Sequence, residues 1–250
     1  MIPGIQISSF RPLLSTPEGV AQVMAETARM GCTTVQLQWI DFSVPPEVIV
    51  REMERRGIRS VSTQDLFEVV QARLDYFIRL NRLSGGEWVC VSRIPPEYAG
   101  PAGLAEFVQQ LERLEQRLAP EGLKLCFHPR AEDFAAADGV CPVDVLMQRW
   151  HGGALCLDLY HAYRAGLAPE AALRRWAGRV CMVHFKDYRP GPAGDMLTPA
   201  GSGVIPWDAA LRACRETQVP YGFVEQETWD GDPFRCLGQA FAWLRAQTAE

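Results

Sequence analysis

The chain has 250 residues, of which 48% are hydrophobic, and a formal net charge of −5 with a pI near 5.5. This length fits one α/β barrel or two average domains. The acidic balance argues against nucleic-acid binding, which needs clustered Lys and Arg. No apolar run approaches the roughly 20 residues of a membrane span. The first apolar run follows Met1-Ile2-Pro3-Gly4 directly, so we expect no signal peptide.

The chain alternates strand-like and helix-like segments from one end to the other. Short apolar runs predict eight strands, at Gly4–Ser8, Thr34–Gln38, Ile58–Thr63, Trp88–Ser92, Leu123–His128, Ala154–Asp158, Val180–Phe185 and Gly222–Gln226. Amphipathic patterns predict helices between them, at Pro17–Met30, Pro46–Arg55, Leu66–Leu80, Leu104–Leu118, Asp144–Trp150, Pro169–Trp176, Trp207–Thr217 and Pro233–Arg245. Glycines that typically terminate helices follow four of them: Gly31, Gly57, Gly85 and Gly122. Eight βα units in this length predict a (β/α)₈ TIM barrel, a single domain over residues 1–250.

The eight cysteines include four within the apolar strand-like runs: Cys90, Cys126, Cys156 and Cys181. No CxxC pair occurs in the sequence. Buried free cysteine behaves as a small hydrophobic residue, and disulfides are rare in the cytosol. We therefore predict reduced core thiols in a cytoplasmic protein.

Two connections at the carboxyl ends of the predicted strands are long and irregular. They span Arg130–Pro142 after the fifth strand and Tyr188–Pro206 after the seventh. In a TIM barrel the chemistry lies at this end of the strands. We therefore expect either connection to cover a bound substrate as a lid.

Four of the predicted strands end in a residue that can bind a divalent metal. ALCLD ends in Asp158, VCMVH in His184 and YGFVE in Glu225, and the fifth strand, KLCFH, ends in His128. Because parallel strands deliver their carboxyl ends to one face of a barrel, we expect these side chains to converge there. Imidazole and carboxylate ligands suit a hard or borderline dication such as Mn²⁺ or Mg²⁺.

Each of these residues also has an ordinary structural explanation. A buried Asp158 needs a cation, which Arg164 would supply as well as a metal. Histidines at such positions are often hydrogen-bonded core or rim residues, and a rim glutamate often forms an ion pair. Glu132 and Asp133 follow His128 closely and are alternative ligands at the fifth strand.

Three residues at the same strand ends are predicted to be catalytic. Glu225 is the expected base, since a carboxylate beside a metal can take a proton from a carbon next to a polarised carbonyl. His161 follows Asp158 by three residues and shares its face if the segment is helical, which suits a proton transfer or only a helix cap. Lys186, two residues after His184, would steady an oxyanion or a phosphate, unless it faces solvent.

Polar side chains also recur in the first strands. Glutamines at a barrel mouth can read sugar hydroxyls, although on the outer face of a strand they carry no functional meaning. Gln36 belongs to this series of glutamines. We predict that the substrate is bound by Gln6, Gln38, Gln64, Arg93 and Arg130.

Several motifs resemble the sugar phosphate isomerase/epimerase family, the xylose-isomerase-like TIM barrels. The likeness is closest in LDLYHAYRAG, GRVCMVHFKD, GSGVIPW and GFVEQET, extends to GIQIS and GLKLCFHPRAEDF, and includes features of an inosose-dehydratase-like branch. The resemblance implies one divalent ion, Mn, Mg, Co or Zn, held by His128, Asp158, His184 and Glu225. It also implies a keto-sugar isomerase or epimerase that removes a proton next to a metal-bound carbonyl.

The sequence departs from that family at the fifth strand. Epimerases of the family carry a glutamate there, whereas this chain reads FHPR. This departure argues against a symmetrical two-carboxylate epimerisation. It leaves open a one-base mechanism, in which Glu225 takes the proton and His161 or Lys186 returns it elsewhere or assists loss of hydroxide.

Three other functions remain open. A sugar or polyol dehydratase would use the same site, and a non-catalytic barrel would bind a sugar after losing its acid/base pair. A phosphodiesterase like the DNA-repair endonucleases of this fold would need more histidines than four and a basic face. We expect a sugar or polyol as the partner, neither nucleic acid nor membrane, and a homodimer as a plausible assembly.

Overall fold

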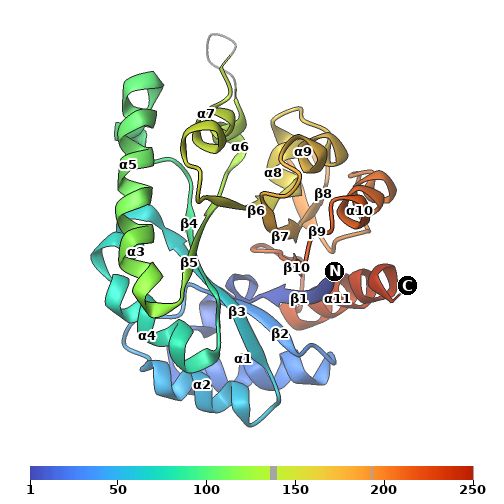
Figure 1. Cartoon of the computed structure of the whole chain (residues 1–250). Helices are drawn as coiled ribbons and strands as arrows, with labels where there is room; N and C mark the ends of the chain where they lie inside the picture. Colours follow the sequence, from blue (N-terminus) through green and yellow to red (C-terminus); the bar gives the residue numbers. More distant parts are fainter. Residues whose placement is uncertain (136–139, 193, 250) are drawn as a thin grey trace.

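The computed structural model describes residues 1–135, 140–192 and 194–249, and within them eight parallel strands close into a barrel (Figure 1). Around the barrel the strands follow the order β1-β10-β7-β6-β5-β4-β3-β2. They are β1 (Ile2–Gln6), β2 (Thr34–Gln38), β3 (Arg59–Leu66), β4 (Trp88–Ser92), β5 (Lys124–His128), β6 (Ala154–Asp158), β7 (Val180–Phe185) and β10 (Tyr221–Val224). The predicted single-domain TIM barrel is confirmed.

An outer layer of helices surrounds the barrel (Figure 1). The α-helices are α1 (Pro17–Arg29), α2 (Pro46–Glu54), α3 (Phe67–Ala72), α4 (Leu74–Ser84), α5 (Gly100–Leu118), α6 (Ala131–Phe134), α7 (Pro142–Arg149), α8 (Leu159–Arg164), α9 (Pro169–Arg175), α10 (Trp207–Glu216) and α11 (Pro233–Thr248). The short 3-10 helices are η1 (Ile7–Leu13), η2 (Pro96–Tyr98) and η3 (Ala119–Glu121). The predicted terminating glycines have positive φ, as expected of helix stops: Gly31, Gly57, Gly85 and Gly122.

The boundaries near β1 and β3 differ from the prediction. β3 continues to Leu66, so the helix predicted over Leu66–Leu80 begins later. That helix is also divided, because Arg73 leaves the helical region between α3 and α4, with its guanidinium 5.3 Å from the ring of Phe42. β1 ends at Gln6, two residues early, because the chain turns there into η1.

Alternate residues of β5 face two different packed regions. In β5, Leu125 and Phe127 belong to the large core between barrel and helices, whereas Cys126 lies in a separate cluster inside the barrel. That inner cluster consists of Val61, Cys90, Cys126, Cys156, Cys181, Met182 and Phe223. The four strand cysteines are therefore buried free thiols in the barrel interior.

Both long connections contain regular structure, so their prediction as irregular loops was wrong. The segment Arg130–Pro142 includes α6, and its residues 136–139 lie outside the described residues. The segment Tyr188–Pro206 includes most of an antiparallel hairpin of β8 (Asp187–Arg189) and β9 (Met196–Thr198), and its residue 193 lies outside the described residues. A role as lids stays a prediction for both.

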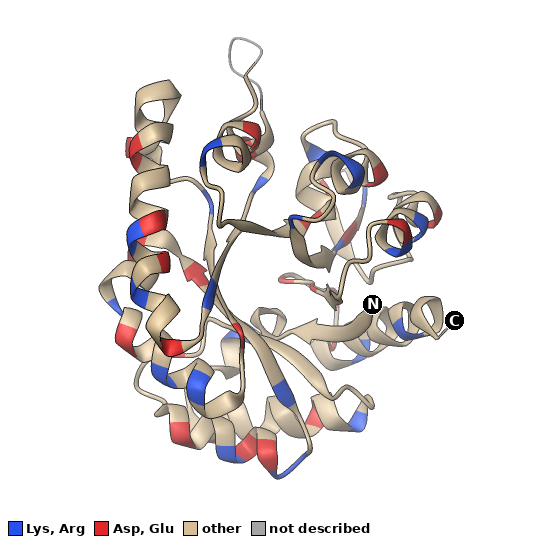
Figure 2. Cartoon of the chain, viewed as in Figure 1, with Lys and Arg blue, Asp and Glu red and all other residues tan. Residues whose placement is uncertain are grey.

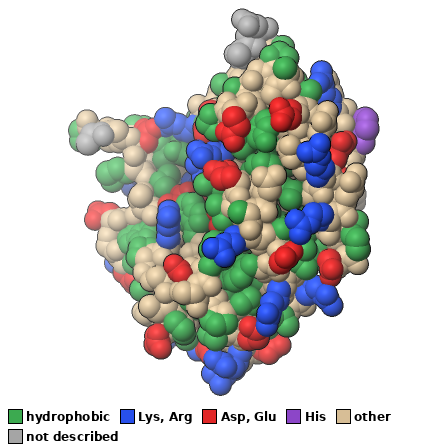
Figure 3. Space-filling view, turned by 90° about the vertical axis from the view of Figure 1, so that its left-hand side faces the viewer, with side chains coloured by type: hydrophobic (Ala, Val, Ile, Leu, Met, Phe, Trp, Pro, Cys, Tyr) green, Lys and Arg blue, Asp and Glu red, His purple; other side chains and the backbone are tan. Residues whose placement is uncertain are grey.

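The outer helices carry charges of both signs (Figure 2). Ion pairs join neighbouring helices, since Arg79 of α4 pairs with Glu47 of α2 and Arg174 of α9 with Glu216 of α10. Basic and acidic side chains also intermingle on the face drawn in Figure 3. In the described ranges, no helix is both long and apolar enough to span a membrane. The expected lack of nucleic-acid binding, the cytoplasmic location and the homodimer stay predictions.

Candidate metal centre

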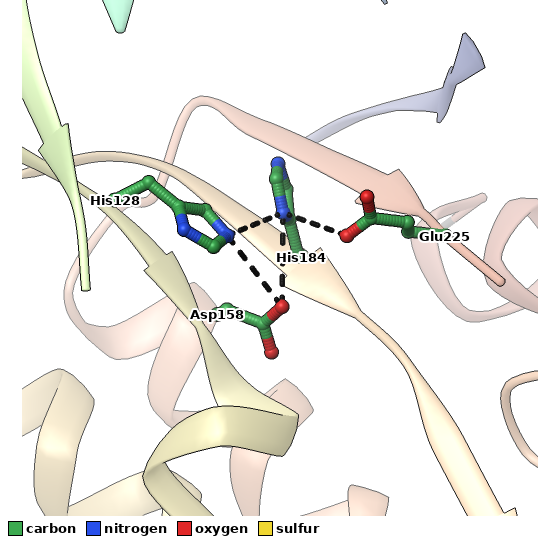
Figure 4. A group of neighbouring side chains, drawn as sticks. All are labelled: His128, Asp158, His184 and Glu225. Carbon is green, nitrogen blue, oxygen red and sulfur yellow. Dashed lines mark hydrogen bonds and ion pairs between the residues drawn. The ribbon is translucent and has the colours of Figure 1, made fainter. Parts of the chain in front are cut away.

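Four side chains converge at the carboxyl end of the barrel strands (Figure 4). His128 and Asp158 end β5 and β6, His184 lies in β7, and Glu225 follows β10. Nδ1 of His184 lies 3.1 Å from Nε2 of His128, 3.2 Å from Oε2 of Glu225 and 3.8 Å from Oδ2 of Asp158. One ligand atom of each residue lies within 4.8 Å of the other three. The four atoms therefore surround a common point.

The two carboxylate oxygens of Asp158 have different surroundings. Oδ1 accepts a hydrogen bond from the backbone N–H of His161 at 3.0 Å and thereby caps α8. Oδ2 is buried and has no hydrogen-bond partner among the described residues. A buried anionic oxygen without a donor requires a cation nearby. Oδ2 is the oxygen that faces the two histidines.

The spacing of the donor atoms fits a metal ion. In a tetrahedral site, ligands bound at about 2.0–2.2 Å lie about 3.3–3.6 Å apart. The other ligand atoms lie 3.1 to 3.8 Å from Nδ1 of His184, and no separation in the cluster exceeds 4.8 Å. Two imidazole nitrogens with two carboxylate oxygens suit Zn²⁺, Mn²⁺ or Co²⁺, whereas Mg²⁺ prefers oxygen ligands alone. His128, Asp158, His184 and Glu225 would hold such an ion.

Lys186 supplies a fixed positive charge beside this cluster. Its ammonium lies 3.1 Å from Oε2 of Glu225, 3.5 Å from Oδ2 of Asp158 and 2.7 Å from Oε1 of Glu227. Burial disfavours a charged lysine, but these carboxylates outweigh it and hold the pKa of Lys186 well above its ordinary value. Burial likewise opposes ionisation of Asp158, yet Lys186 and the histidines hold the pKa of Asp158 well below its ordinary value.

Arg164 does not pair with Asp158, and the acidic residues after His128 do not join the cluster. Arg164 forms an ion pair with Asp195 and not with Asp158. Asp133 accepts the backbone N–H groups of Arg130 and Ile94 at 2.7 and 3.1 Å, so both of its oxygens are occupied. The cluster therefore takes His128, and not its acidic neighbours, from the fifth strand.

A cavity of about 290 Å³ opens onto the cluster. Some of the predicted substrate-binding residues line this cavity and others do not. Gln38, Gln64 and Arg130 line the cavity. Gln6 is fully buried and its amide donates to Oε1 of Gln36 at 2.9 Å, so it lies within the barrel and not on the cavity wall. Arg93 is not among the lining residues either, because its guanidinium turns to Glu68 at 3.3 Å.

His161 lies in the same cavity, where the spacing from Asp158 predicted it. The segment after Asp158 is helical, and Nε2 of His161 lies 3.8 Å from Oδ2 of Asp158. Burial is the main cause that lowers the pKa of His161 to about 3. The imidazole is therefore neutral at neutral pH.

Two serines and a second glutamate of the site were missed in the sequence. The Ser8 hydroxyl donates to Oε1 of Glu225 at 2.7 Å, and Oγ of Ser92 lies 3.3 Å from Nδ1 of His128. Glu227 lines the cavity and pairs with Lys186. Ser8 and Glu227 each lie two residues beyond a residue already singled out, so strand periodicity was an available signal.

Arg11 and Trp39 also line the cavity and were not predicted. The Arg11 guanidinium lies 4.4 Å from the centre of the Trp39 ring, a cation–π contact. Trp39 has a φ of 59°, in the left-handed region that a tryptophan rarely adopts. No sequence rule assigns such a backbone to a tryptophan, so this pair had no signal.

Asp187 anchors the connection that follows β7. The buried carboxylate accepts hydrogen bonds from the backbone N–H groups of Gly201 and Gly203 at 3.2 and 2.9 Å and from the Trp207 indole at 2.8 Å. A Cβ at Gly203 would collide with that carboxylate, which explains the glycine. The VHFKD and GSGVIPW motifs are therefore two halves of one interaction that holds the rim of the site.

The chain matches known structures over nearly its whole length. One is a sugar phosphate isomerase/epimerase from Parabacteroides distasonis, with 15% identity, 98% coverage of both chains and a TM-score of 0.79. Another is the probable 3-DHS dehydratase AsbF from Bacillus anthracis, with 12% identity, 98% coverage of both chains and a TM-score of 0.76. A third is the IOLI protein with a bound zinc atom, with 14% identity, coverage of 100% and 97%, and a TM-score of 0.72. At these identities the likeness shows a shared fold.

The amino-acid sequence itself shows the family of the chain. No curated protein matches the chain significantly. Residues 24–247, however, match the family described as the xylose isomerase-like TIM barrel. The resemblance seen in the motifs is thus confirmed, and the chain belongs to the xylose isomerase-like TIM barrel family.

Proposed function

We propose that the protein is a metal-dependent isomerase acting on a keto sugar or sugar derivative, with Glu225 as its base. The observation that carries this proposal is the four-residue cluster at the wall of a cavity of about 290 Å³. A bound dication would polarise a substrate carbonyl and acidify the neighbouring C–H. Structures with this fold at 12–15% identity include a sugar phosphate isomerase/epimerase and a probable 3-DHS dehydratase, which is in keeping with such chemistry.

The acidic groups of the cavity all come from one side of the barrel. Glu225 and Glu227, the acidic residues that line the cavity, both follow β10. The wall formed by β2, β3 and β4 presents the uncharged side chains Gln38, Gln64 and Ser92. A proton removed from one face is therefore returned to the same face, which favours isomerisation by one base over epimerisation by two.

The chain's own residues divide this work. The Ser8 hydroxyl fixes Oε1 of Glu225 at 2.7 Å, which orients the carboxylate that receives the proton. Lys186 lies 3.1 Å from the other oxygen and would stabilise the developing oxyanion. The amides of Gln38 and Gln64 would bind sugar hydroxyls, and His161 would contact a further hydroxyl at the β6 side of the cavity.

Dehydration of the same class of substrate is the second candidate. Removal of a proton and loss of a hydroxide on the same face need one base and a nearby acid. The Lys186–Glu227 pair, at 2.7 Å, stands on the same side of the cavity as Glu225. The shared fold with AsbF, a probable 3-DHS dehydratase, is compatible with this alternative.

Metal analysis and solvent exchange test the proposal. Purified protein loaded with Mn²⁺, Co²⁺ or Zn²⁺ should retain about one ion per chain, and retention of none would contradict it. The loaded protein is then incubated in D₂O with ketopentoses and ketohexoses, free and phosphorylated, and followed by NMR. Deuterium is expected next to the carbonyl together with an isomeric aldose, whereas a dehydratase would yield a deoxy product.

Glu225→Gln separates the base from the ligand. Because glutamine retains a ligand oxygen, the variant is assayed at a metal concentration at which its ion content equals that of the wild type. Loss of exchange at equal occupancy is the expected result. Exchange that persists at equal occupancy would remove Glu225 as the base, and Glu216→Gln, at an exposed glutamate of the outer helix α10, serves as the control.

A further inference from the structure

A chain of buried glutamines lies against the side of His184 that faces away from the cluster. Nδ1 of His184 faces the other ligands, whereas Nε2 lies 2.6 Å from Oε1 of Gln36. Gln36 lies in β2, across the barrel from β7, and both residues are fully buried. An imidazole that binds a metal through one nitrogen usually donates the other N–H to such an acceptor.

The polarity of this contact is set by a backbone group. The N–H of Ser8 can only donate, and it donates to Oε1 of Gln6 at 3.4 Å. The amide nitrogen of Gln6 must therefore face Gln36, and it donates to Oε1 of Gln36 at 2.9 Å. Oε1 of Gln36 is then an acceptor, so Nε2 of His184 must carry the proton. In the neutral imidazole the lone pair of His184 is then on Nδ1, the nitrogen that faces the cluster.

The chain continues from Gln36 to the cavity. The amide nitrogen of Gln36 donates to Oε1 of Gln64 at 3.0 Å, and that of Gln64 donates to Oε1 of Gln38 at 3.4 Å. The side-chain amides of Gln6, Gln36 and Gln64 therefore each donate to the next glutamine, in one direction from Ser8 to the cavity wall. The Cys156 sulfur also lies 3.2 Å from Nε2 of His184, but a thiol is a weak acceptor.

We infer that Gln36 is a positioning residue that holds His184 in the Nε2–H tautomer, with Gln6 fixing the orientation of Gln36. Gln36 touches neither the cavity nor the common point of the four ligands. It acts only through His184, by keeping Nδ1 unprotonated and the ring in one orientation. The inference rests on the proposed function only in taking the cluster as a metal site.

Nitrogen NMR of histidine in the metal-free protein tests the tautomer without any activity assay. The ¹⁵N signals of His184, identified by their absence in His184→Gln, should show a protonated Nε2 and an unprotonated Nδ1. A protonated Nδ1 in the wild type overturns the inference, and this measurement needs no substitution at Gln36. It also stands apart from the proposed function, because a protein with this tautomer that binds no metal would refute only the latter.

Substitutions at Gln36 test its effect on the metal. Gln36→Leu should lower the affinity for Zn²⁺ or Co²⁺ about 10–100-fold, as expected for loss of an outer partner of a ligand histidine. Gln36→Glu keeps an acceptor facing Nε2 and should retain both the tautomer and the affinity. Gln226→Leu, a buried amide outside the chain of glutamines, is the control and should retain both. A Gln36→Leu protein with the wild-type tautomer and an affinity within two-fold would overturn the inference.

Discussion

The ammonium of Lys186 lies 3.1 Å from Oε2 of Glu225, the same oxygen that lies 3.2 Å from Nδ1 of His184. The ammonium therefore contacts an oxygen that faces the candidate metal cluster. Asp158 and Glu227 also lie within 3.5 Å of the ammonium, so Lys186 compensates one of the three carboxylate charges around it. The stability of the metal-free protein should therefore depend on Lys186 more strongly than that of the metal-loaded protein.

Lys186→Gln should destabilise the metal-free protein by about 3–5 kcal/mol, since it leaves buried carboxylates without their cation. A dication would replace part of that charge, so the gain in stability on adding Mn²⁺ should be larger in the variant than in the wild type. Thermal unfolding in EDTA and in Mn²⁺ measures both effects. Lys124→Gln, at the chain's other lysine, should behave as the wild type. An equal metal-induced gain in Lys186→Gln and the wild type would contradict this prediction.

Asp158→Asn should separate the two roles of Asp158. Asparagine caps a helix about as well as aspartate, so the contact with the His161 N–H should survive and α8 should remain folded. The charged Oδ2 is lost, and with it the stabilisation by metal, which for a site at 100 times its Kd is about 2.7 kcal/mol. Unfolding midpoints with and without Zn²⁺ report the difference. Asp158→Ala should in addition lose about 1 kcal/mol in EDTA, and an undiminished metal shift in Asp158→Asn would argue against ligation by Oδ2.

Asp187→Leu should destabilise the protein by at least about 3 kcal/mol, because several buried donors lose their acceptor. Hydrogen exchange should rise first at Gly201 and Gly203, whose N–H groups the carboxylate accepts. Urea unfolding followed by tryptophan fluorescence gives the free energy. Asp75→Leu, at a side chain that is 91% exposed, is the control and should stay within about 0.5 kcal/mol. Protection of both glycines at the wild-type level would show that the rim does not depend on Asp187.

The contribution of Asp133 to the stability of the folded protein should decrease as the pH rises. Burial is the main cause that raises its pKa to about 6 in the folded protein, against about 3.9 when unfolded. Between these values the folded state binds more protons, so the contribution of Asp133 to stability is full below about pH 4 and is lost as the pH rises through 6. The change amounts to at most about 3 kcal/mol. Urea unfolding of the wild type and of Asp133→Asn at pH 4.5 and 7 measures it, and a difference between the two proteins that is independent of pH would refute it.

The sequence alone determined the barrel and the four candidate ligands, because both depend on local order. The hydrophobic periods of strands and helices can be recognised within single segments. The last residue of a parallel strand lies at the carboxyl face of the barrel, irrespective of which strands are its neighbours. His128 and Asp158 could be placed in this way. His161 followed because a helix begins directly after Asp158.

Only the tertiary structure decided which side chains meet across strands. Gln6 lies level with Gln36 and Gln38 level with Gln64, a register that closure of the whole barrel sets and that no single segment encodes. Ser8 and Glu225 lie 217 residues apart in the sequence, and their hydrogen bond depends on the same closure, by which β1 pairs with β10. The sequence therefore predicted the inner ligands, while their hydrogen-bond partners required the closed sheet.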